Sequence, residues 1–163
     1  MPKSGLDHRF LDQTDIRIVE LLSTDGRLSV TELAARVGLS KTPCQTRLKR
    51  LIDDGVIHGF CAVVSPDVLE RAHVAFVEVV MSDTRERALE GFNKTVRGIP
   101  EIEECHMIAG GFDYLLKVRS RDIQDYRRIL GEVISELPHV SKTSTHVAME
   151  RVKDQTDLVR SSS

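Results

Sequence analysis

The sequence predicts an α+β protein made of two small domains, and three observations carry this prediction. In the first third of the chain, apolar residues recur at helical spacing around glycine-bearing turns. In the remainder, runs of strand-forming residues alternate with helical patterns. Between the two regions lies Ser65-Pro66-Asp67, which is a turn signal. In this chain of 163 residues we expect a helical domain at residues 1–64, a linker at 65–72, a mixed domain at 73–153 and a flexible tail at 154–163.

The first two predicted helices form the support of the N-terminal domain. The first begins after Asp12 and ends near Asp25-Gly26, with a buried side formed by Ile16, Ile18, Val19 and Leu22. The second starts at a capping box of Ser29 and Glu32, and its apolar stripe is Val30, Leu33, Ala34 and Val37. Gly38 is placed to end this helix in a left-handed conformation.

A third helix is predicted from Ser40, with a buried stripe of Cys44, Leu48, Leu51 and Ile52. Between Lys41 and Arg50 there are four cations and no acid, so the outer face is a ridge of hydrogen-bond donors. A charged outer face is by itself typical of any solvated helix. Two helices joined by a tight glycine turn, however, let the second helix enter the major groove of DNA. The candidate DNA contacts are Ser40, Lys41, Thr42, Gln45, Thr46, Arg47, Lys49 and Arg50.

The stretch after Gly55 is rich in strand formers, at Val56, Ile57, Phe60, Ala62 and Val63. Its length suits either a two-stranded wing or a strand that leads out of the domain. The N-terminal fold that we expect is therefore a winged helix-turn-helix.

The second half has the order β-α-β-β-α-β, which predicts a ferredoxin-like domain with helices on one face of its sheet. The expected elements are strand 73–81, helix 84–97, strand 101–109, a tight turn at Gly110-Gly111, strand 112–119, helix 122–137 and strand 140–150. Because the other sheet face needs cover, we expect a homodimer formed through this domain.

Composition excludes several classes of protein. Hydrophobic residues make up 40% and charged residues 29% of the chain, no apolar run is long enough for a bilayer, and the N-terminus lacks a signal peptide, so we expect a cytoplasmic protein with no membrane partner. The formal net charge is −2, but residues 1–64 carry 9 Lys and Arg against 8 Asp and Glu, or +1. Such weak net charge implies that a DNA-binding chain gains affinity by oligomerisation.

No constellation for catalysis or metal binding is evident, and we expect no cofactor and no enzymatic activity. Cys44, Cys61 and Cys105 lack metal or redox spacing. The run Glu103-Glu104-Cys105-His106 places titratable groups on opposite faces of a strand, so they cannot act on one substrate atom.

Two motifs give the chain a resemblance to a known family. The segment LDQTDIRIVELLSTDGRLSVTELAARVGLSKTPCQTRLKRLIDDGVIHGF is similar to the N-terminal winged helix-turn-helix of the Lrp/AsnC transcription regulators. The segment ECHMIAGGFDYLLKVRSRDIQDYRRILGEVISELPHVSKTSTHVAMERVK resembles the effector-binding domain of the same family. Together the motifs place the resemblance over residues 11–153.

The resemblance implies an effector pocket between subunits, lined by the turn at Gly110-Gly111 and by the last strand. By position it implicates Met107, Gly110, Gly111, Asp113, Tyr114, Ile123, His146, Val147 and Ala148. Turn amides can bind the carboxylate of an amino acid, and Asp113 can hold its ammonium group. The family often has an acid where this chain has Gly111, which affects the ammonium contact. Without the resemblance, the two glycines are also explained by a simple hairpin turn.

The resemblance thus implies a sequence-specific regulator that binds double-stranded DNA and responds to a small amino acid. Leucine, another branched-chain amino acid and proline are the candidate effectors. Dimers that assemble further into tetramers or octamers are expected to present paired recognition helices. The alternatives are an amino-acid sensor or interaction protein that does not bind DNA, and an amino-acid-processing enzyme, which the missing acid–base constellation disfavours.

Overall fold

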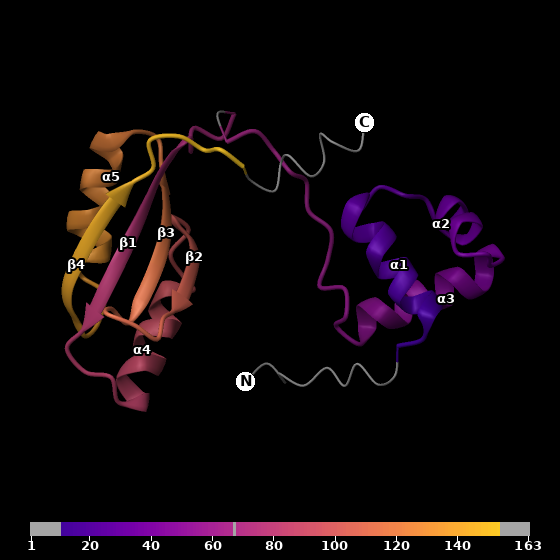
Figure 1. Cartoon of the computed structure of the whole chain (residues 1–163), viewed down its shortest axis with the longest axis horizontal. Helices are drawn as coiled ribbons and strands as arrows, with labels where there is room; N and C mark the ends of the chain where they lie inside the picture. Colours follow the sequence, from indigo (N-terminus) through magenta and orange to yellow (C-terminus); the bar gives the residue numbers. More distant parts are fainter. Residues whose placement is uncertain (1–10, 67, 154–163) are drawn as a thin grey trace. The chain divides into compact units, whose positions relative to one another are not determined.

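The computed structural model describes residues 11–66 and 68–153, which divide into two compact units formed chiefly by residues 11–63 and 64–152 (Figure 1). The first unit contains α1 (Gln13–Thr24), α2 (Val30–Arg36) and α3 (Lys41–Asp53). The second contains β1 (His73–Met81), α4 (Glu86–Val96), β2 (Ile102–Met107), β3 (Tyr114–Ser120), α5 (Ile123–Ile129), the π-helical turn η2 (Leu130–Ile134) and β4 (Val140–Val147). The predicted tail at 154–163 lies outside the described residues. Among those residues no helix is both long and apolar enough to cross a membrane.

The core of the first unit joins all three helices. Its buried residues are Ile18, Leu22, Leu33, Ala34, Cys44 and Leu51. Two predicted core positions are wrong, because Ile16 is 42% exposed and Ile52 is 40% exposed. In α1 the buried stripe instead begins at Asp15, which shares one helix face with Ile18 and Leu22.

Local signals in this unit are confirmed. Ser29 and Glu32 form the predicted capping box, with the Glu32 N–H 3.2 Å from Ser29 Oγ and the Ser29 N–H 2.9 Å from Glu32 Oε2. Gly38 has a φ of +70°, which a residue with a Cβ adopts only with strain. Ser40 occupies the N-cap of α3, although its side chain makes no capping hydrogen bond.

The strand predicted after Gly55 is wrong for the described residues, which contain no strand between α3 and β1. In this stretch Phe60 is 54% and Val63 48% exposed. Strand-forming side chains favour an extended backbone, but a strand also needs a partner for its N–H and C=O groups. No such partner strand occurs in the described part of the first unit.

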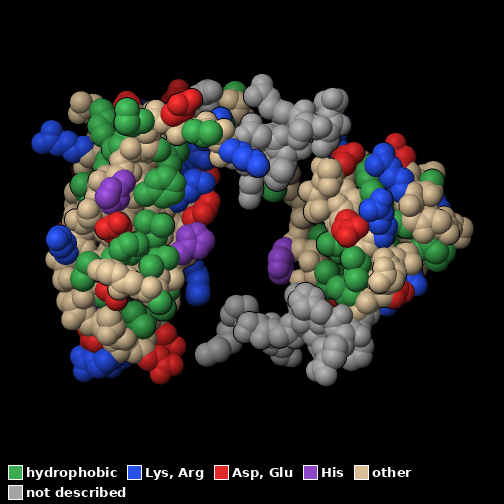
Figure 2. All heavy atoms as spheres, viewed as in Figure 1, with side chains coloured by type: hydrophobic (Ala, Val, Ile, Leu, Met, Phe, Trp, Pro, Cys, Tyr) green, Lys and Arg blue, Asp and Glu red, His purple; other side chains and the backbone are tan. Residues whose placement is uncertain are grey.

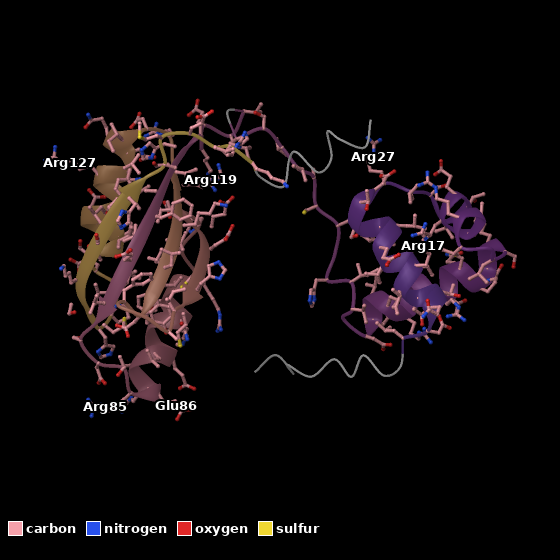
Figure 3. All side chains as sticks on the ribbon, viewed as in Figure 1. Arg17, Arg27, Arg85, Glu86, Arg119 and Arg127 are labelled. Atoms are coloured by element: carbon pink, nitrogen blue, oxygen red, sulfur yellow. The ribbon has the colours of Figure 1, made fainter. Side chains whose placement is uncertain are left out.

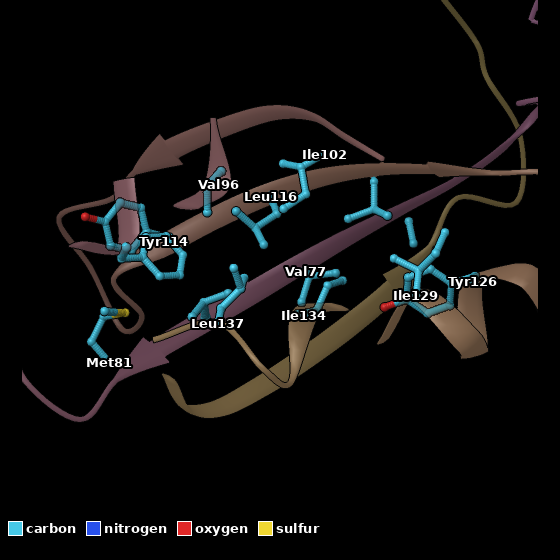
Figure 4. Packing of buried hydrophobic residues seen from close by; sticks show 14 residues of the cluster. Val77, Met81, Val96, Ile102, Tyr114, Leu116, Tyr126, Ile129, Ile134 and Leu137 are labelled. Carbon is cyan, nitrogen blue, oxygen red and sulfur yellow. The ribbon is translucent and has the colours of Figure 1, made fainter. Parts of the chain in front are cut away.

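The second unit is a four-stranded antiparallel sheet with the strand order β2-β3-β1-β4. This order, together with the βαββαβ sequence of elements, confirms the predicted ferredoxin-like domain. Side chains from alternate positions of β1 and β3 pack against α4, α5 and η2 on one sheet face (Figure 4). The central buried residues are Val77, Val79, Leu116, Val118, Phe92, Ile129 and Ile134.

The other sheet face carries no helix from the described residues and is turned toward the viewer in Figures 1 and 2. It mixes hydrophobic side chains such as Phe76, which is 37% exposed, with charged and histidine side chains. Lys117 Nζ lies 2.8 Å from Glu104 Oε1, and His146 Nε2 lies 3.3 Å from Glu78 Oε1. This surface, which we call the open face, is partly polar and partly apolar.

Three details differ from the sequence prediction. The tight turn at Gly110-Gly111 is wrong, because β2 ends at Met107 and β3 starts at Tyr114, which leaves a longer connection at 108–113. The helix predicted at 122–137 widens into the π-helical turn η2, where the Ser135 N–H and hydroxyl both donate to the carbonyl of Leu130. Ile123, which was predicted to face inward, is 50% exposed at the start of α5.

Candidate nucleic-acid interface and candidate ligand site

The outer face of α3 presents most of the predicted DNA contacts to solvent. Its exposed members are Ser40, Lys41, Thr42, Gln45, Thr46, Lys49 and Arg50. The Thr46 hydroxyl donates to the carbonyl of Thr42 at 3.1 Å. In the part of the chain that the structure describes, no hydrogen bond or ion pair engages the side chains of Lys41 and Gln45. These two groups are therefore free to contact a ligand without breaking an internal interaction.

Two of the four cations on α3 are held by acids of α1. Arg47 Nη1 lies 2.9 Å from Asp15 Oδ1 and 2.5 Å from Asp12 Oδ2. Arg50 Nη2 lies 2.5 Å from Asp15 Oδ2. The N–H of Asp15 and the guanidinium of Arg47 lower the pKa of Asp12 below its ordinary value, and the hydrogen bonds to Asp12 and Asp15 raise the pKa of Arg47. The structure thus pairs both the half-buried Arg47 and the exposed Arg50 with acids at the start of α1, so neither guanidinium is without a partner within the chain.

The remaining two cations are arranged differently. Lys49 Nζ lies 2.6 Å from Asp53 Oδ2, in a surface pair one turn along the same helix. Such an exposed pair contributes little to stability, so phosphate can displace Asp53 from Lys49 at little cost. Lys41 has no acidic partner in the described residues. Fewer than the four cations counted in the sequence are therefore available on this surface to contact phosphate.

The sequence did not predict that Asp12 and Asp15 hold two of the candidate DNA contacts, Arg47 and Arg50. The available signal was an acid placed three residues before Ile18 and seven before Leu22, on the apolar stripe of α1. A buried carboxylate at such a position requires donors from another element.

The connection 108–113 forms one end of the candidate ligand site. The Ile108 N–H donates to the carbonyl of Asp113 at 2.8 Å, and Asp113 Oδ2 accepts the N–H of Met81 at 2.7 Å. One carboxylate oxygen of Asp113 is therefore committed to the backbone of β1, which fixes the side chain. Gly110 and Gly111 are exposed, and Met107 is 58% exposed.

Tyr114 lies in the core instead of at this exposed end. Its side chain is 1% exposed, and its ring centroid is 4.4 Å from that of Phe92 on α4 (Figure 4). Within one chain Tyr114 therefore belongs to the core next to the connection 108–113 and does not line a surface site.

The remaining candidate ligand residues lie at the opposite end of the sheet. Val147 pairs with Ala75, whereas Tyr114 pairs with Val79, four residues further along β1. Four residues of strand span about 13 Å. In Figure 3, Arg119 marks the end of the sheet near Val147, and Arg85 marks the end near the connection 108–113. One chain therefore does not bring together the two groups, which are Met107, Gly110, Gly111 and Asp113 on one side and Ile123, His146, Val147 and Ala148 on the other.

Two hollows on the described part of the second unit are lined by other residues. One of about 230 Å³ is lined by residues that include Arg71, Arg119 and Arg128, and one of about 580 Å³ by residues that include Asp83, Arg85 and His139. The described residues also contain no group of three or more His, Cys, Asp or Glu side chains suited to a metal ion.

The two units together define a class of protein. A helix-turn-helix with a donor-rich second helix is joined in one chain to a ferredoxin-like unit whose candidate ligand residues lie in two groups at opposite ends of its sheet. This is the organisation of a transcription regulator that binds DNA through one domain and a small molecule through the other.

Comparison with known proteins agrees with this class and specifies it. Residues 11–58 match the family model for winged helix-turn-helix DNA-binding, and residues 74–158 match the model for the Lrp/AsnC ligand binding domain. The chain belongs to the Lrp/AsnC family of transcriptional regulators, as the sequence resemblance predicted.

Relatives extend over nearly the full chain. The proline dehydrogenase transcriptional activator of Rhizobium radiobacter is 65% identical over 144 residues, which cover 88% of this chain and 92% of the relative. The leucine-responsive regulatory protein of Escherichia coli K12 is 44% identical over 149 residues, covering 91% of each chain. A transcriptional regulator from Neisseria meningitidis, solved as a complex with L-Met, superposes with a TM-score of 0.80 at 32% identity and covers 90% of this chain and 94% of that one.

Proposed function

We propose that this regulator responds to proline and activates transcription of a gene for proline breakdown. The observation that carries the proposal is the 65% identity, over 92% of its length, to a proline dehydrogenase transcriptional activator. The proposed role includes no catalysis and is exercised in the cytoplasm, where the DNA is. Leucine is the second candidate effector, favoured by the 44% identity to a leucine-responsive regulatory protein.

The chemistry of the connection 108–113 supports proline. Since the Met81 N–H occupies one lone pair of Asp113 Oδ2, the carboxylate has fewer acceptor sites left for an ammonium group. Gly111 supplies no carboxylate where the family often has one. The secondary ammonium of proline has two N–H donors, whereas the primary ammonium of leucine has three. In a site with few acceptors, proline is therefore left with fewer unsatisfied N–H donors than leucine.

The proposed effector site is completed by a second subunit. The two groups of candidate residues lie at opposite ends of the sheet, so the connection 108–113 of one subunit would meet the end of β4 of another. We assign the open face, with Phe76 near its centre, to the dimer, and further association of dimers to tetramers or octamers. DNA would then be bound by paired α3 helices, through those of the eight predicted residues that are not paired with Asp12 or Asp15.

Thermal unfolding of the purified protein with L-proline, L-leucine and the other amino acids at millimolar concentration tests this proposal. A ligand present at about 100 times its Kd stabilises the folded state by about 2.7 kcal/mol, so the effector must raise the Tm. We expect the largest rise with L-proline, and D-proline is the matched control. A larger rise with L-leucine would replace proline by the second candidate.

The variant Gly111→Asp sharpens the test. A Cβ at Gly111 meets no heavy atom within 4 Å, so the substitution fits without a clash. An added carboxylate supplies the missing acceptor, and the preference for L-proline over L-leucine should fall. An unchanged preference would show that Gly111 does not face the ammonium group.

A further inference from the structure

The carboxylate of Asp15 is the most deeply buried charged group in the described part of the first unit. Its side chain is 1% exposed, although the residue lies in the first turn of α1. Burial of an unpaired carboxylate is costly, so the group needs donors that remain in place. Oδ1 accepts from Arg47 Nη1, while Oδ2 accepts from Arg50 Nη2 and, at 3.2 Å, from the N–H of Asp12.

The two arginines come from one face of α3, three residues apart. Residues at this spacing are neighbours on one helix face, so a single carboxylate contacts α3 at two positions about one turn apart. The buried side chains of Cys44 and Leu51 set which side of α3 faces the core, and the two arginine contacts add a polar restraint on the rotation of the helix about its axis. Asp12 Oδ2 also accepts from Arg47 Nη1, so Arg47 is held by two carboxylates.

The rotation of α3 decides which side chains face DNA. Gln45 and Thr46 lie between Lys41 and Arg47 in sequence, and both are exposed. A turn of about 100° per residue means that a modest rotation of the helix moves Gln45 off a base edge. Arg47 is only 30% exposed and is committed to two acids, so it is poorly placed to read a base itself.

We propose that Asp15 is a positioning residue for DNA recognition. It holds Arg47 and Arg50 against α1, and these arginines fix the rotation of α3 so that Gln45 and Thr46 face the bases. The inference rests on the proposed contact of α3 with DNA. It also assigns Arg47 a role in orientation rather than in base reading.

The salt dependence of binding distinguishes held arginines from free ones. Each phosphate contact contributes about 0.9 to the slope of log K against log salt. Lys41 and Lys49 alone give a slope of about 1.8 for each α3 helix, whereas all four cations on phosphates give about 3.6. We expect the lower value for the contribution of α3 in the unaltered protein.

The experiment measures fluorescence anisotropy of the full chain with two labelled duplexes at several salt concentrations. The first duplex is selected by the unaltered protein from a random-sequence library, and the second is its scrambled counterpart. Asp15→Asn keeps the size of the side chain but removes its charge. We expect the ratio of the two affinities to fall at least tenfold, and the slope to steepen by up to about 1.8 for each helix as the released arginines reach phosphates.

Two further variants complete the design. Asp12→Asn retains an N-cap residue while releasing only one contact of Arg47, so the slope should steepen measurably but by no more than about 0.9 per helix. This variant keeps the inference testable if Asp15→Asn does not fold. Glu20→Gln removes an exposed acid of α1 that pairs with Arg17 at 3.1 Å, and it should change neither ratio nor slope.

The outcomes separate this inference from the proposed function. A loss of folded protein alone lowers both affinities equally, so an unchanged ratio and slope in Asp15→Asn and an unchanged slope in Asp12→Asn overturn the positioning role. If the unaltered protein shows no salt-dependent binding to either duplex, the assignment of α3 to DNA fails and this inference fails with it.

Discussion

Replacing Gln45 by Ala tests how α3 reads DNA. Gln45 is exposed and has no hydrogen-bond partner in the described residues, so the substitution leaves the core of the unit intact. A bidentate contact from Gln to adenine contributes about 1–3 kcal/mol of discrimination against other bases. Since 1.4 kcal/mol corresponds to a factor of ten, each helix should lose roughly 5- to 150-fold in preference for the selected duplex.

The assay compares affinities for selected and scrambled duplexes at fixed salt. Lys49→Ala is the matched control, because Lys49 is an exposed cation whose partner Asp53 lies on the same helix. It should weaken binding to both duplexes alike and reduce the salt slope by about 0.9 for each helix. Equal losses on the two duplexes for Gln45→Ala would refute the assignment of Gln45 as a base reader.

Three further predictions concern the rest of the chain. Phe76→Arg places a charge in the middle of the open face and should yield smaller assemblies in sedimentation velocity, whereas an unchanged size distribution would exclude this face from the dimer. Tyr114→Phe should preserve the Tm shift caused by the effector, since Tyr114 is buried. Asp113→Asn should reduce that shift, since Asp113 lies in the exposed connection 108–113. The reverse result would place Tyr114 in the effector site. The pKa of Asp12 lies below 3.8 in the folded protein, so the stabilisation by its carboxylate is present above about pH 4 and is lost as pH falls through the lowered value. In urea titrations between about pH 5 and pH 3, the free energy of unfolding should therefore fall less in Asp12→Asn than in the unaltered protein. An equal fall in both proteins would contradict this linkage.

Features encoded within a few neighbouring residues were predictable from sequence. The capping box at Ser29 and Glu32 and the left-handed Gly38 depend only on local hydrogen bonding and backbone sterics. Strand β1 has the predicted bounds because its run of strand-forming residues has no competing helical period. The order of elements then limited the second unit to few topologies, of which the ferredoxin-like one is confirmed.

Features that depend on distant partners were not predictable. Apolar periodicity placed Ile16 inside and gave no reason to bury Asp15, because the arginines that neutralise Asp15 lie more than thirty residues away. The strand expected after Gly55 lacked a partner strand. The predicted effector residues can be tested only in an assembly of subunits, since Asp113 and Val147 lie near opposite ends of β1 in a single chain.

The most direct test of the account is the affinity for the selected duplex with and without L-proline, at a concentration that raises the Tm. Coupling between two sites typically amounts to about 1–3 kcal/mol, so we predict a change of roughly 5- to 150-fold in affinity with L-proline and none with D-proline. Unchanged affinity with L-proline, and with every other amino acid that raises the Tm, would contradict the central claim that the second unit controls DNA binding by α3.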